Sequence, residues 1–563
     1  MGIIVAILKN IENDDIEAMW AYTGVDASHF YKMISNRKKL RWIRVHQLFD
    51  TPDEGPNFLS NELRYIDWDY YPRSPFPDTF RPNKLVVLKL GYSLQEELWK
   101  VLELECMPNL IHMPNFDGLL CLQKLKLLKC DKMEKIDPSL GNLTRLENLT
   151  LECCKNLQII PNISKMGKLE SLEINKCHKN LKFPEIKSDM KRLVRLYLNG
   201  VCIEDMLSSI GERCANIKTL HLVNCNYTKF NEAKFDRLKR LEDFISTNSH
   251  ATETDHQPSI WLQPAFPHLK ISLQKLVLND FYWQDEEISN DIGQLANLLR
   301  LKLCFNRFTR IHFSLSQLTR LKHLDLSHCT LLVEVPELPT RLAFFRADDC
   351  EKLTSMGDSY KKCKWLCQVS LIQGGIINDG GSLLESMLQG NAIENKNMVL
   401  QLQGFKNTKE IALFNGDGCR LKLSQNWRND FSGFLMCSLS HFGIESVSMK
   451  KHVMESDMQY EDNKDCEESN ERLTVWYVSF ASLRHNTPTW WKSINNAYSI
   501  SFKPKMILDH KCYGFGVRMV ARKSGTGPTE TLTAQEESEF SHYTPKIRIL
   551  EDSESESKIK MYI

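Results

Sequence analysis

The sequence lacks the motifs on which common catalytic and cofactor sites are built. Its 563 residues contain no G-x-x-x-x-G-K-[ST] phosphate loop, no H-E-x-x-H zinc motif, no C-x-x-C pair and no G-x-S-x-G nucleophile elbow. Cys363 and Cys367 are one helical turn apart, but a metal site would need a second pair of ligands. We therefore predict that this chain is not an enzyme and holds no metal or cofactor.

The sequence also lacks a strong net charge and a long apolar run. Lys and Arg number 72 against 71 Asp and Glu, a net charge of +1, so no overall field favours nucleic acid or a membrane surface. The apolar run Ile3 to Leu8 is too short for a signal peptide or a spanning helix. We expect a cytoplasmic protein, with the nucleus as the alternative, whose 18 cysteines stay reduced.

What the sequence does contain is one repeated frame, Leu-x-x-Leu-x-Leu-x-x-Cys, as in LKHLDLSHC from Leu321 to Cys329. Looser copies begin at Leu63, Leu85, Leu193, Leu273 and Leu342. Close copies span Leu122 to Cys130, Leu146 to Cys154, Leu169 to Cys177, Ile217 to Cys225 and, with Asn last, Leu298 to Asn306. A period in the low twenties with this consensus predicts a leucine-rich repeat. The expected fold is an α/β leucine-rich-repeat solenoid with parallel strands on its concave face.

Alternation within the frame separates core residues from surface residues. In a short strand, Leu125 and Leu127 face inward while Lys124 and Lys126 face solvent. A single repeat cannot bury its leucines, so stacked repeats share one core. The Cys that ends a frame is predicted to be a small buried filler where the chain leaves the strand.

The order of segments predicts several domains. We expect an entry segment with a degenerate first repeat at 1–60, repeats at 61–360, a glycine-marked junction at 361–397, and an antiparallel β-sandwich at 398–522. Residues 523–563 are predicted to be a disordered, acidic, Ser- and Thr-rich tail. Two polar loops, Ser246–Ser259 and the acidic Glu455–Glu471, are candidate binding loops, although the favoured interpretation of each is a plain surface loop.

With no catalytic motif, the candidate site is the outward face of the repeat strands. Aromatic and Arg side chains dominate interaction hot spots, so Tyr197, Arg195 and Arg300 are the leading candidates. The full set of predicted contact residues is Lys124, Lys126, Asn148, Thr150, Glu173, Arg195, Tyr197, His221, Lys275, Arg300, Lys302, His323 and Asp325.

The segment from Leu63 to Lys100 carries a more specific pattern than the repeat consensus. It contains Leu63-Arg64, Trp68, Tyr71-Pro72, Phe76-Pro77, Phe80-Arg81-Pro82 and Leu85-Val86 in that order. This pattern resembles the opening repeats of plant TIR-NBS-LRR intracellular disease resistance receptors. The region around Trp427, Phe431–Phe434, Trp476–Val478 and Gly514–Arg518 is similar to the jelly-roll or Ig-like domain (C-JID) that follows the repeats in the same receptors.

The resemblance implies a recognition module in plant innate immunity. In that family, the repeats and the domain after them bind a pathogen effector or a guarded host protein, and the signal passes to a nucleotide-binding (NB-ARC) domain and a TIR domain. Neither of those two domains is found in this sequence, so a receptor that contains them is a further expected partner. The alternative is a stand-alone repeat scaffold or adaptor, for example one that presents substrates to a ubiquitin ligase.

Overall fold

The computed structural model describes most of the chain in two compact units, Met1–Asp255 with Ile260–Lys275, and His256–Ser259 with Leu276–Ile563. The described residues are 4–8, 16–22, 24–35, 37–46, 48, 50, 54–72, 76–77, 79–80, 87–91, 103–105, 116, 122–178, 181–203, 206–225, 237–247, 272–375, 377–390, 396–405, 418–440, 444–453, 469–507, 513–522, 547–551 and 558–562.

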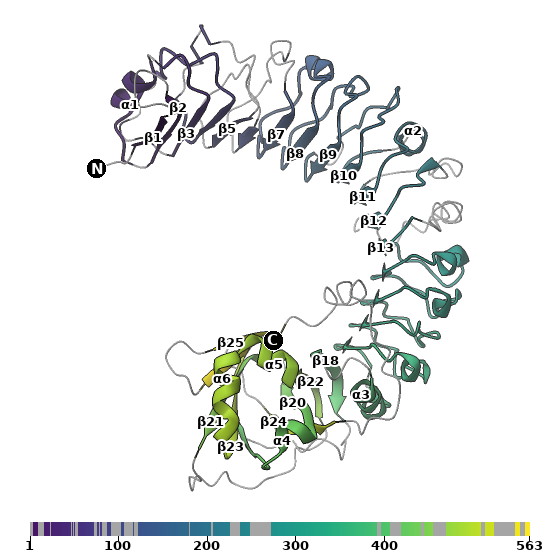
Figure 1. The fold of residues 1–563 in the computed structure, drawn as a ribbon. Coiled ribbons are helices and arrows are strands. Elements are labelled where there is room, and N and C mark those ends of the chain that lie inside the picture. Colours follow the sequence, from purple (N-terminus) through teal and green to yellow (C-terminus); the bar gives the residue numbers. More distant parts are fainter. Residues whose placement is uncertain are drawn as a thin grey trace. The chain divides into compact units, whose positions relative to one another are not determined.

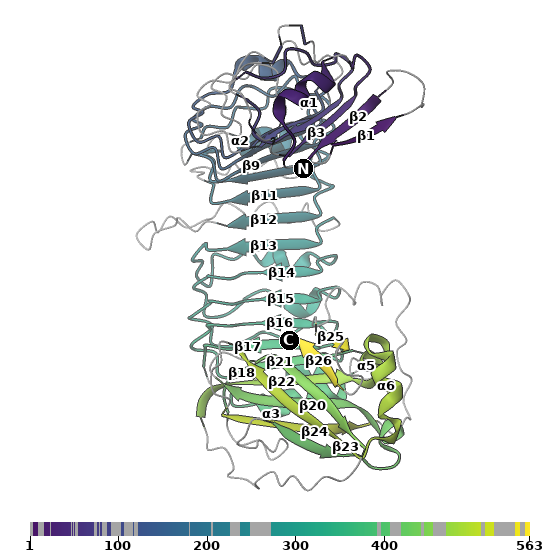
Figure 2. The ribbon, with the colours of Figure 1, turned by 90° about the vertical axis from the view of Figure 1, so that its left-hand side faces the viewer.

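The first unit is a stack of parallel strands (Figure 1), and the view in Figure 2 shows the arrows of β9, β11 and β12 pointing the same way. Strands β2 to β12 each pair in parallel with the next, and β1 adds to β2 as an antiparallel hairpin partner. The strands are β1 (Ile4–Leu8), β2 (Ile16–Ala21), β3 (Trp42–Val45), β4 (Tyr65–Trp68), β5 (Val87–Gly91), β6 (Glu103–Glu105), β7 (Lys124–Leu128), β8 (Asn148–Glu152), β9 (Ser171–Asn175), β10 (Arg195–Asn199), β11 (Thr219–Val223) and β12 (Asp243–Thr247). Between them lie α1 (Ala27–Ile34), η2 (Pro138–Asn142) and α2 (Met206–Arg213).

The repeat frame folds as its alternation predicts. Leu125 and Leu127 are at most 1% exposed, and the leucines at the same places in the following repeats are equally buried. The chain then leaves several of these strands through one residue with a positive φ, such as Lys129 (54°) or Lys176 (52°), directly before the Cys. The parallel-strand solenoid that the period predicts is therefore confirmed.

The frame-ending cysteines stack from repeat to repeat. The thiol of Cys154 donates to the carbonyl of Leu127 at 3.7 Å, and that of Cys177 donates to the carbonyl of Leu151 at 3.6 Å. Hydrogen bonding by Cys130 is the largest effect that raises the pKa of Cys154 to about 12, and burial adds to it. These thiols are therefore protonated and unreactive, which fits a packing role.

The aromatic residues of the Leu63–Lys100 pattern form one cluster at the start of the solenoid. Trp68 packs edge-on against Phe30 of α1 (ring centroids 5.7 Å apart) and against Tyr71 (5.0 Å). Tyr71 contacts Phe76, which contacts Phe80 in turn, and all these side chains are at most 7% exposed. Large aromatic side chains bury much apolar area, so this cluster forms a substantial part of the core of the first repeats.

The second unit has parallel strands of its own, and β13 (Lys275–Asn279) begins at the boundary between the two units. Its parallel strands are β14 (Arg300–Lys302), β15 (His323–Asp325), β16 (Phe344–Arg346), β17 (Gln368–Leu371) and β18 (Met398–Phe405). The connections carry η6 (Asn290–Gln294), η7 (Leu315–Gln317), η8 (Ser359–Lys362) and α3 (Gly380–Gln389).

Strand β18 belongs to the repeats and to the domain that follows them. One edge pairs in parallel with β17, and the other pairs antiparallel with β22. From there, sheet 1 runs β18–β22–β20–β24, with β20 at Phe431–Ser440, β22 at Ser469–Ser479 and β24 at Gly514–Ala521. The repeats therefore pass directly into the C-terminal domain without a break in the hydrogen-bonded sheet.

A second antiparallel sheet shares a hydrophobic core with sheet 1. Sheet 2 has the order β19–β23–β21–β26–β25, with β19 at Cys419–Lys422, β21 at Ile444–His452, β23 at Ser499–Met506, β25 at Arg548–Glu551 and β26 at Lys558–Tyr562. Phe434 and Trp476 from sheet 1 meet Phe502 and Met449 from sheet 2 in this core. Helices α4 (Trp427–Asp430), α5 (Phe480–Asn486), α6 (Pro488–Ser493) and η9 (Ile494–Asn496) contribute Trp427, Leu483, Trp490 and Ile494.

Two stretches differ from what the sequence predicts. Residues 361–397, expected to be a junction, contain the repeat strand β17 and α3. The expected disordered tail at 523–563 contains β25 and β26, because Lys-Ile-Lys-Met-Tyr alternates and its Ile559 and Met561 enter the core. Most of the two candidate loops, 248–259 and 455–468, lies outside the described residues.

No helix within the described ranges is long and apolar enough to cross a membrane.

Candidate protein-interaction surface

The outward residues of the first unit stand in two straight rows, because neighbouring strands pair in exact register. One row is Lys124, Asn148, Ser171, Arg195, Thr219 and Asp243. The other is Lys126, Thr150, Glu173, Tyr197, His221 and Ile245. Adjacent positions in a row are separated by the strand spacing of about 5 Å. Side chains from six repeats are thus placed side by side on one face.

The predicted residues of this unit differ in how accessible they are. Lys124 and Arg195 are exposed, and Lys126, Asn148, Thr150, Glu173 and Tyr197 are half-buried in the rows. Arg195 Nε lies 3.5 Å from Ser171 Oγ, so its guanidinium lies along the row toward β9. Among these residues Arg195 combines exposure with the hydrogen-bonding capacity of a hot-spot residue.

Tyr197, His221, Asp243 and Lys275 make up the most connected part of this surface, which we call the Tyr197 cluster. The rings of Tyr197 and His221 meet edge to face with centroids 5.5 Å apart. His221 Nε2 lies 3.3 Å from Asp243 Oδ2, and Lys275 Nζ lies 3.1 Å from the same oxygen. The edge-to-face contact with His221, which itself lies against Asp243, limits the motion of the Tyr197 ring.

The charge of Asp243 is stabilised by its neighbours. Burial raises the pKa of this carboxyl, but the close contact with His221 and the hydrogen bond from Lys275 outweigh burial and leave the pKa below its usual value. Asp243 is therefore ionised at neutral pH. The sequence analysis did not select it, although it stands at an outward place of the weak repeat LEDFIST.

In the second unit, the predicted residues Arg300, Lys302 and His323 lie on the outward face of β14 and β15. Arg300 pairs in register with His323, which pairs with Phe344, and the rings of His323 and Phe344 stack 4.1 Å apart. Burial, helped by the charge of Lys302, lowers the pKa of His323 to about 4. His323 is consequently a neutral, aromatic part of the surface at neutral pH. Phe344 was missed, although it occupies the outward place of the looser frame at Leu342.

Asp325 differs from the prediction of an outward, exposed side chain, because it is only 4% exposed. Its carboxylate accepts the Ser327 hydroxyl at 2.8 Å and lies 3.0 Å from Lys302 Nζ. Burial raises its pKa, but Lys302 and the hydrogen bonds from Ser327 outweigh burial and lower it. Asp325 therefore orders Lys302 and Ser327 and does not present its carboxylate to solvent.

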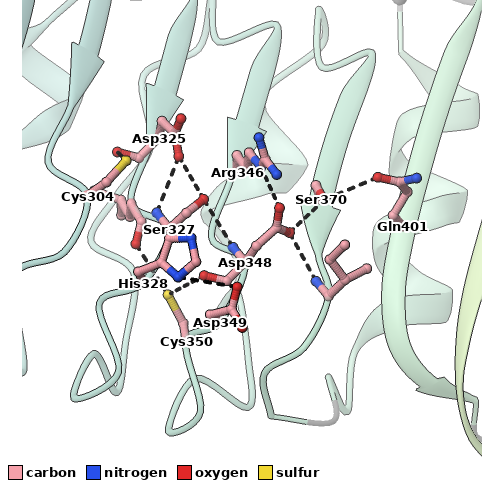
Figure 3. A network of polar contacts seen from close by, with 12 residues as sticks. Cys304, Asp325, Ser327, His328, Arg346, Asp348, Asp349, Cys350, Ser370 and Gln401 are labelled. Atoms are coloured by element: carbon pink, nitrogen blue, oxygen red, sulfur yellow. Dashed lines mark hydrogen bonds and ion pairs between the residues drawn. The ribbon is translucent and has the colours of Figure 1, made fainter. Parts of the chain in front are cut away.

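Asp325 begins a polar network that crosses the last repeats (Figure 3). Ser327 Oγ accepts the N–H of Asp348 at 3.3 Å. The Asp348 carboxylate accepts Arg346, the Ser370 hydroxyl at 2.6 Å and the N–H of Ile372 at 3.1 Å. Ser370 Oγ also lies 3.2 Å from Gln401 Oε1 on β18. This network links β15, β16 and β17 to the strand that opens the C-terminal domain.

A further outward group at the beginning of the solenoid was missed by the sequence analysis. Trp42 of β3 stacks on Tyr65 of β4 with centroids 4.5 Å apart, and Trp42 is 46% exposed. Arg44 and Asp67 pair beside them at 3.2 Å. The alternation in LRWIRV predicted this strand, but only the register shows that the two rings are stacked.

Within the described parts of the chain, no three His, Cys, Asp or Glu side chains come together as a metal site. The chemistry available on this surface is hydrogen bonding, ion pairing and aromatic contact.

Comparison with known proteins finds plant disease resistance proteins. TMV resistance protein N of Nicotiana glutinosa is 23% identical over 386 residues, which cover 59% of this chain and 33% of that protein. Disease resistance-like protein DSC1 of Arabidopsis thaliana is 30% identical over 353 residues, covering 54% and 29%. Disease resistance protein RPS4B of Arabidopsis thaliana is 25% identical over 369 residues, covering 61% and 27%. The chain thus spans about a third of the length of these relatives.

No protein-family profile matches the chain. Among solved structures, the LRR protein LIC12759 of Leptospira interrogans aligns with a TM-score of 0.48 and 19% identity, covering 68% of this chain and 92% of that one. The relatives confirm the relationship that the Leu63–Lys100 motifs indicated: over its repeat region, this chain is a homologue of the plant TIR-NBS-LRR disease resistance proteins.

Proposed function

We propose that this chain is a non-catalytic recognition module in plant defence, which binds a pathogen effector or a guarded host protein. The observation that carries the proposal is the pair of in-register rows on β7 to β12, with the Tyr197 cluster at one end. Homology to disease resistance proteins supports the defence role. An intracellular location follows from the same relationship and belongs to the proposal.

The Tyr197 cluster has the chemistry of a protein hot spot. Tyr197 offers a ring and a hydroxyl, Arg195 offers a planar guanidinium, and the His221–Asp243–Lys275 contacts hold the ring in place. Tyr and Arg are enriched at the energetic centres of protein interfaces. In the second unit, Arg300, Lys302 and the stacked His323–Phe344 pair provide a similar mixture.

We further propose that the two antiparallel sheets form a β-sandwich that takes part in recognition. The shared core of Phe434, Trp476, Phe502 and Met449 supports this architecture. Direct continuity through β18 supports joint action with the last repeats, β14 to β17, because a partner that contacts both regions contacts one hydrogen-bonded sheet. Such a module would act with a receptor that carries TIR and NB-ARC domains.

The test compares two double variants of the full chain. Arg195→Ala with Tyr197→Ala removes the proposed contacts, and Lys165→Ala with Ile159→Ala is the matched control, since both control residues are exposed and lie outside the strand rows. Affinity for a panel of purified pathogen effectors and host proteins is measured by biolayer interferometry. For any protein that binds, the first variant should weaken binding at least about tenfold and the control less than about twofold. The reverse order would contradict the proposal.

A further inference from the structure

The outward face of sheet 2 carries a dense array of basic side chains. Opposite the core-facing Ile500, Phe502, Val447 and Met449, the alternate positions hold Lys and Arg with intervening Ser. The basic residues are Arg420, Lys422, Lys450, Lys503, Lys505, Lys558 and Lys560. Glu445 of β21 is an acidic neighbour of this face, because its carboxylate pairs with Lys505. We call this array the basic face.

Strand register brings these charges side by side. Arg420 and Lys450 both pair with Ser501 of β23, and Lys450 pairs with Lys558. In the next row, Ser448 lies between Lys503 and Lys560. Neighbouring strands are about 5 Å apart and alternate residues along a strand about 7 Å apart, so the charges form a grid at contact distances. In a chain with a net charge of only +1, this grid is a strong local concentration of positive charge.

The pKa of His452 is consistent with this local concentration of positive charge. Its Nε2 lies 2.9 Å from Ser501 Oγ. Burial lowers the pKa of His452, and the nearby positive charges of Arg420 and Lys450 lower it further. Lys505 has an ion-pair partner, Glu445 at 2.8 Å, and Lys422 lies over the ring of Tyr498 at 5.7 Å. Lys422, Lys450, Lys503, Lys505 and Lys558 remain exposed.

Exposed apolar side chains border the basic face. Val453 (59% exposed) and Tyr498 (38%) lie at one end, where the N–H of Tyr498 bonds to the carbonyl of His452. Ile507 (39% exposed) directly follows the C-terminal end of β23. Leu550 of β25 (39% exposed) pairs with Lys560 of the neighbouring strand β26. These exposed side chains place apolar surface beside the positive charges.

We propose that the basic face is a docking surface for a protein partner that presents acidic side chains mixed with apolar ones. This inference deepens the proposed function, on which it rests, by adding a second contact surface with a stated partner chemistry. Charge complementarity sets the acidic character, and Val453, Tyr498, Ile507 and Leu550 supply apolar contacts.

Two other polyanions fit less well. Single-stranded nucleic acid binds on sheets through aromatic rings in the middle of the face, and here the central places between the basic residues are Ser448 and Ser501. An anionic bilayer needs apolar side chains that insert on one side together, and here Val453 with Tyr498 and Ile507 lie at opposite ends of β23.

The test uses charge reversal in the full chain. The test variant reverses three exposed charges of the basic face: Lys450→Glu, Lys503→Glu and Lys558→Glu. The matched control reverses three lysines that are exposed on the repeats: Lys165→Glu, Lys168→Glu and Lys352→Glu. The probe is a fluorescein-labelled peptide of alternating Glu and Leu, read by fluorescence anisotropy at low and high salt. Circular dichroism verifies folding, and a Lys→Gln series at the same three positions replaces the reversal if that variant does not fold.

The wild type should bind the peptide, and binding should weaken as salt rises. The basic-face reversal should lower the affinity by at least about tenfold, whereas the control should stay within about twofold of the wild type. Equal losses in both variants would overturn the proposal. Tighter binding of a short duplex DNA, or of phosphatidylserine vesicles, than of the peptide would also overturn it.

The same peptide is then measured on the Arg195→Ala and Tyr197→Ala double variant. Unchanged peptide affinity is expected, because these residues are on the repeats. If the repeat surface fails its own test while peptide binding responds to the basic-face reversal, only the proposed role of the repeat rows is lost.

Discussion

Removal of the Asp348 carboxylate is the sharpest test of the network that joins the repeats to the C-terminal domain. Asp348 is 2% exposed, and its carboxylate accepts Arg346, the Ser370 hydroxyl and the N–H of Ile372. Asp348→Ala would leave the amide of Ile372 buried without an acceptor, whereas Ser370 can turn its hydroxyl to Gln401, 3.2 Å away.

The expected loss follows from these contacts. An orphaned buried donor costs about 1–3 kcal/mol, and a hydrogen bond to a charged group contributes about 1.5–3 kcal/mol. Because Ser370 can find a new partner and the Arg346 side chain is 47% exposed, we expect a net loss of about 2–4 kcal/mol. Asp348→Asn keeps an acceptor for Ile372 but loses the ion pair, so its loss should be smaller.

Hydrogen exchange with mass spectrometry measures this effect locally, which a whole-chain melt cannot do in a chain of two units. Faster exchange is expected in peptides that contain β16, β17 and β18. Asp349→Asn is the control, since Asp349 is adjacent, its side chain is 31% exposed, and its carboxylate lies 3.3 Å from His328 Nδ1. If Asp348→Ala and Asp349→Asn changed the exchange of these peptides equally, the network would not have the role assigned to it.

The remaining predictions concern the repeats and pH. Leu125→Ala should destabilise the first unit by about 2–5 kcal/mol, because Leu125 is 1% exposed, whereas Lys124→Ala at an exposed position should cost less than about 0.5 kcal/mol. Equal shifts of the urea midpoint in the two variants would refute the assignment of Leu125 to the core and Lys124 to the surface. The pKa of Asp243 is lowered in the folded protein, so the ionised carboxylate stabilises the fold above its unfolded pKa of about 4 and this effect is lost at lower pH. The difference in free energy of unfolding between the wild type and Asp243→Asn should therefore shrink below about pH 4. The pKa of His323 is lowered to about 4, so unfolding takes up a proton between about pH 6.5 and 4. The free energy of unfolding should therefore decrease as the pH is lowered through that window. His323→Phe, which keeps the stack on Phe344, should remove that part of the pH dependence.

Sequence reasoning was most successful where a short pattern decides the structure. The Leu-x-x-Leu-x-Leu frame fixed which side chains enter the core, so the burial of Leu125 and Leu127 followed from alternation alone. The Trp68, Tyr71 and Phe80 motif indicated the correct relatives, and the structure explains it as a packed aromatic cluster.

Features that depend on a partner far away in the chain were not predicted. Asp325 stands at an outward place of its frame, and its burial arises from Lys302 one repeat earlier and from Ser327. The Ser- and Glu-rich composition around β26 outweighed its short alternation, because its hydrogen-bonding partner β21 is about a hundred residues earlier. The stacking of Trp42 on Tyr65 likewise depends on strand register, which a single frame does not contain.

The most direct test of the central claim, recognition by the outward strand rows, is hydrogen exchange of the full chain with and without a protein that it binds. The account predicts slower exchange on binding in peptides covering β10 (Arg195–Asn199), β11 (Thr219–Val223) and β12 (Asp243–Thr247). Slower exchange confined to the connections between the strands, such as η2 (Pro138–Asn142), with β10 to β12 unchanged, would contradict it.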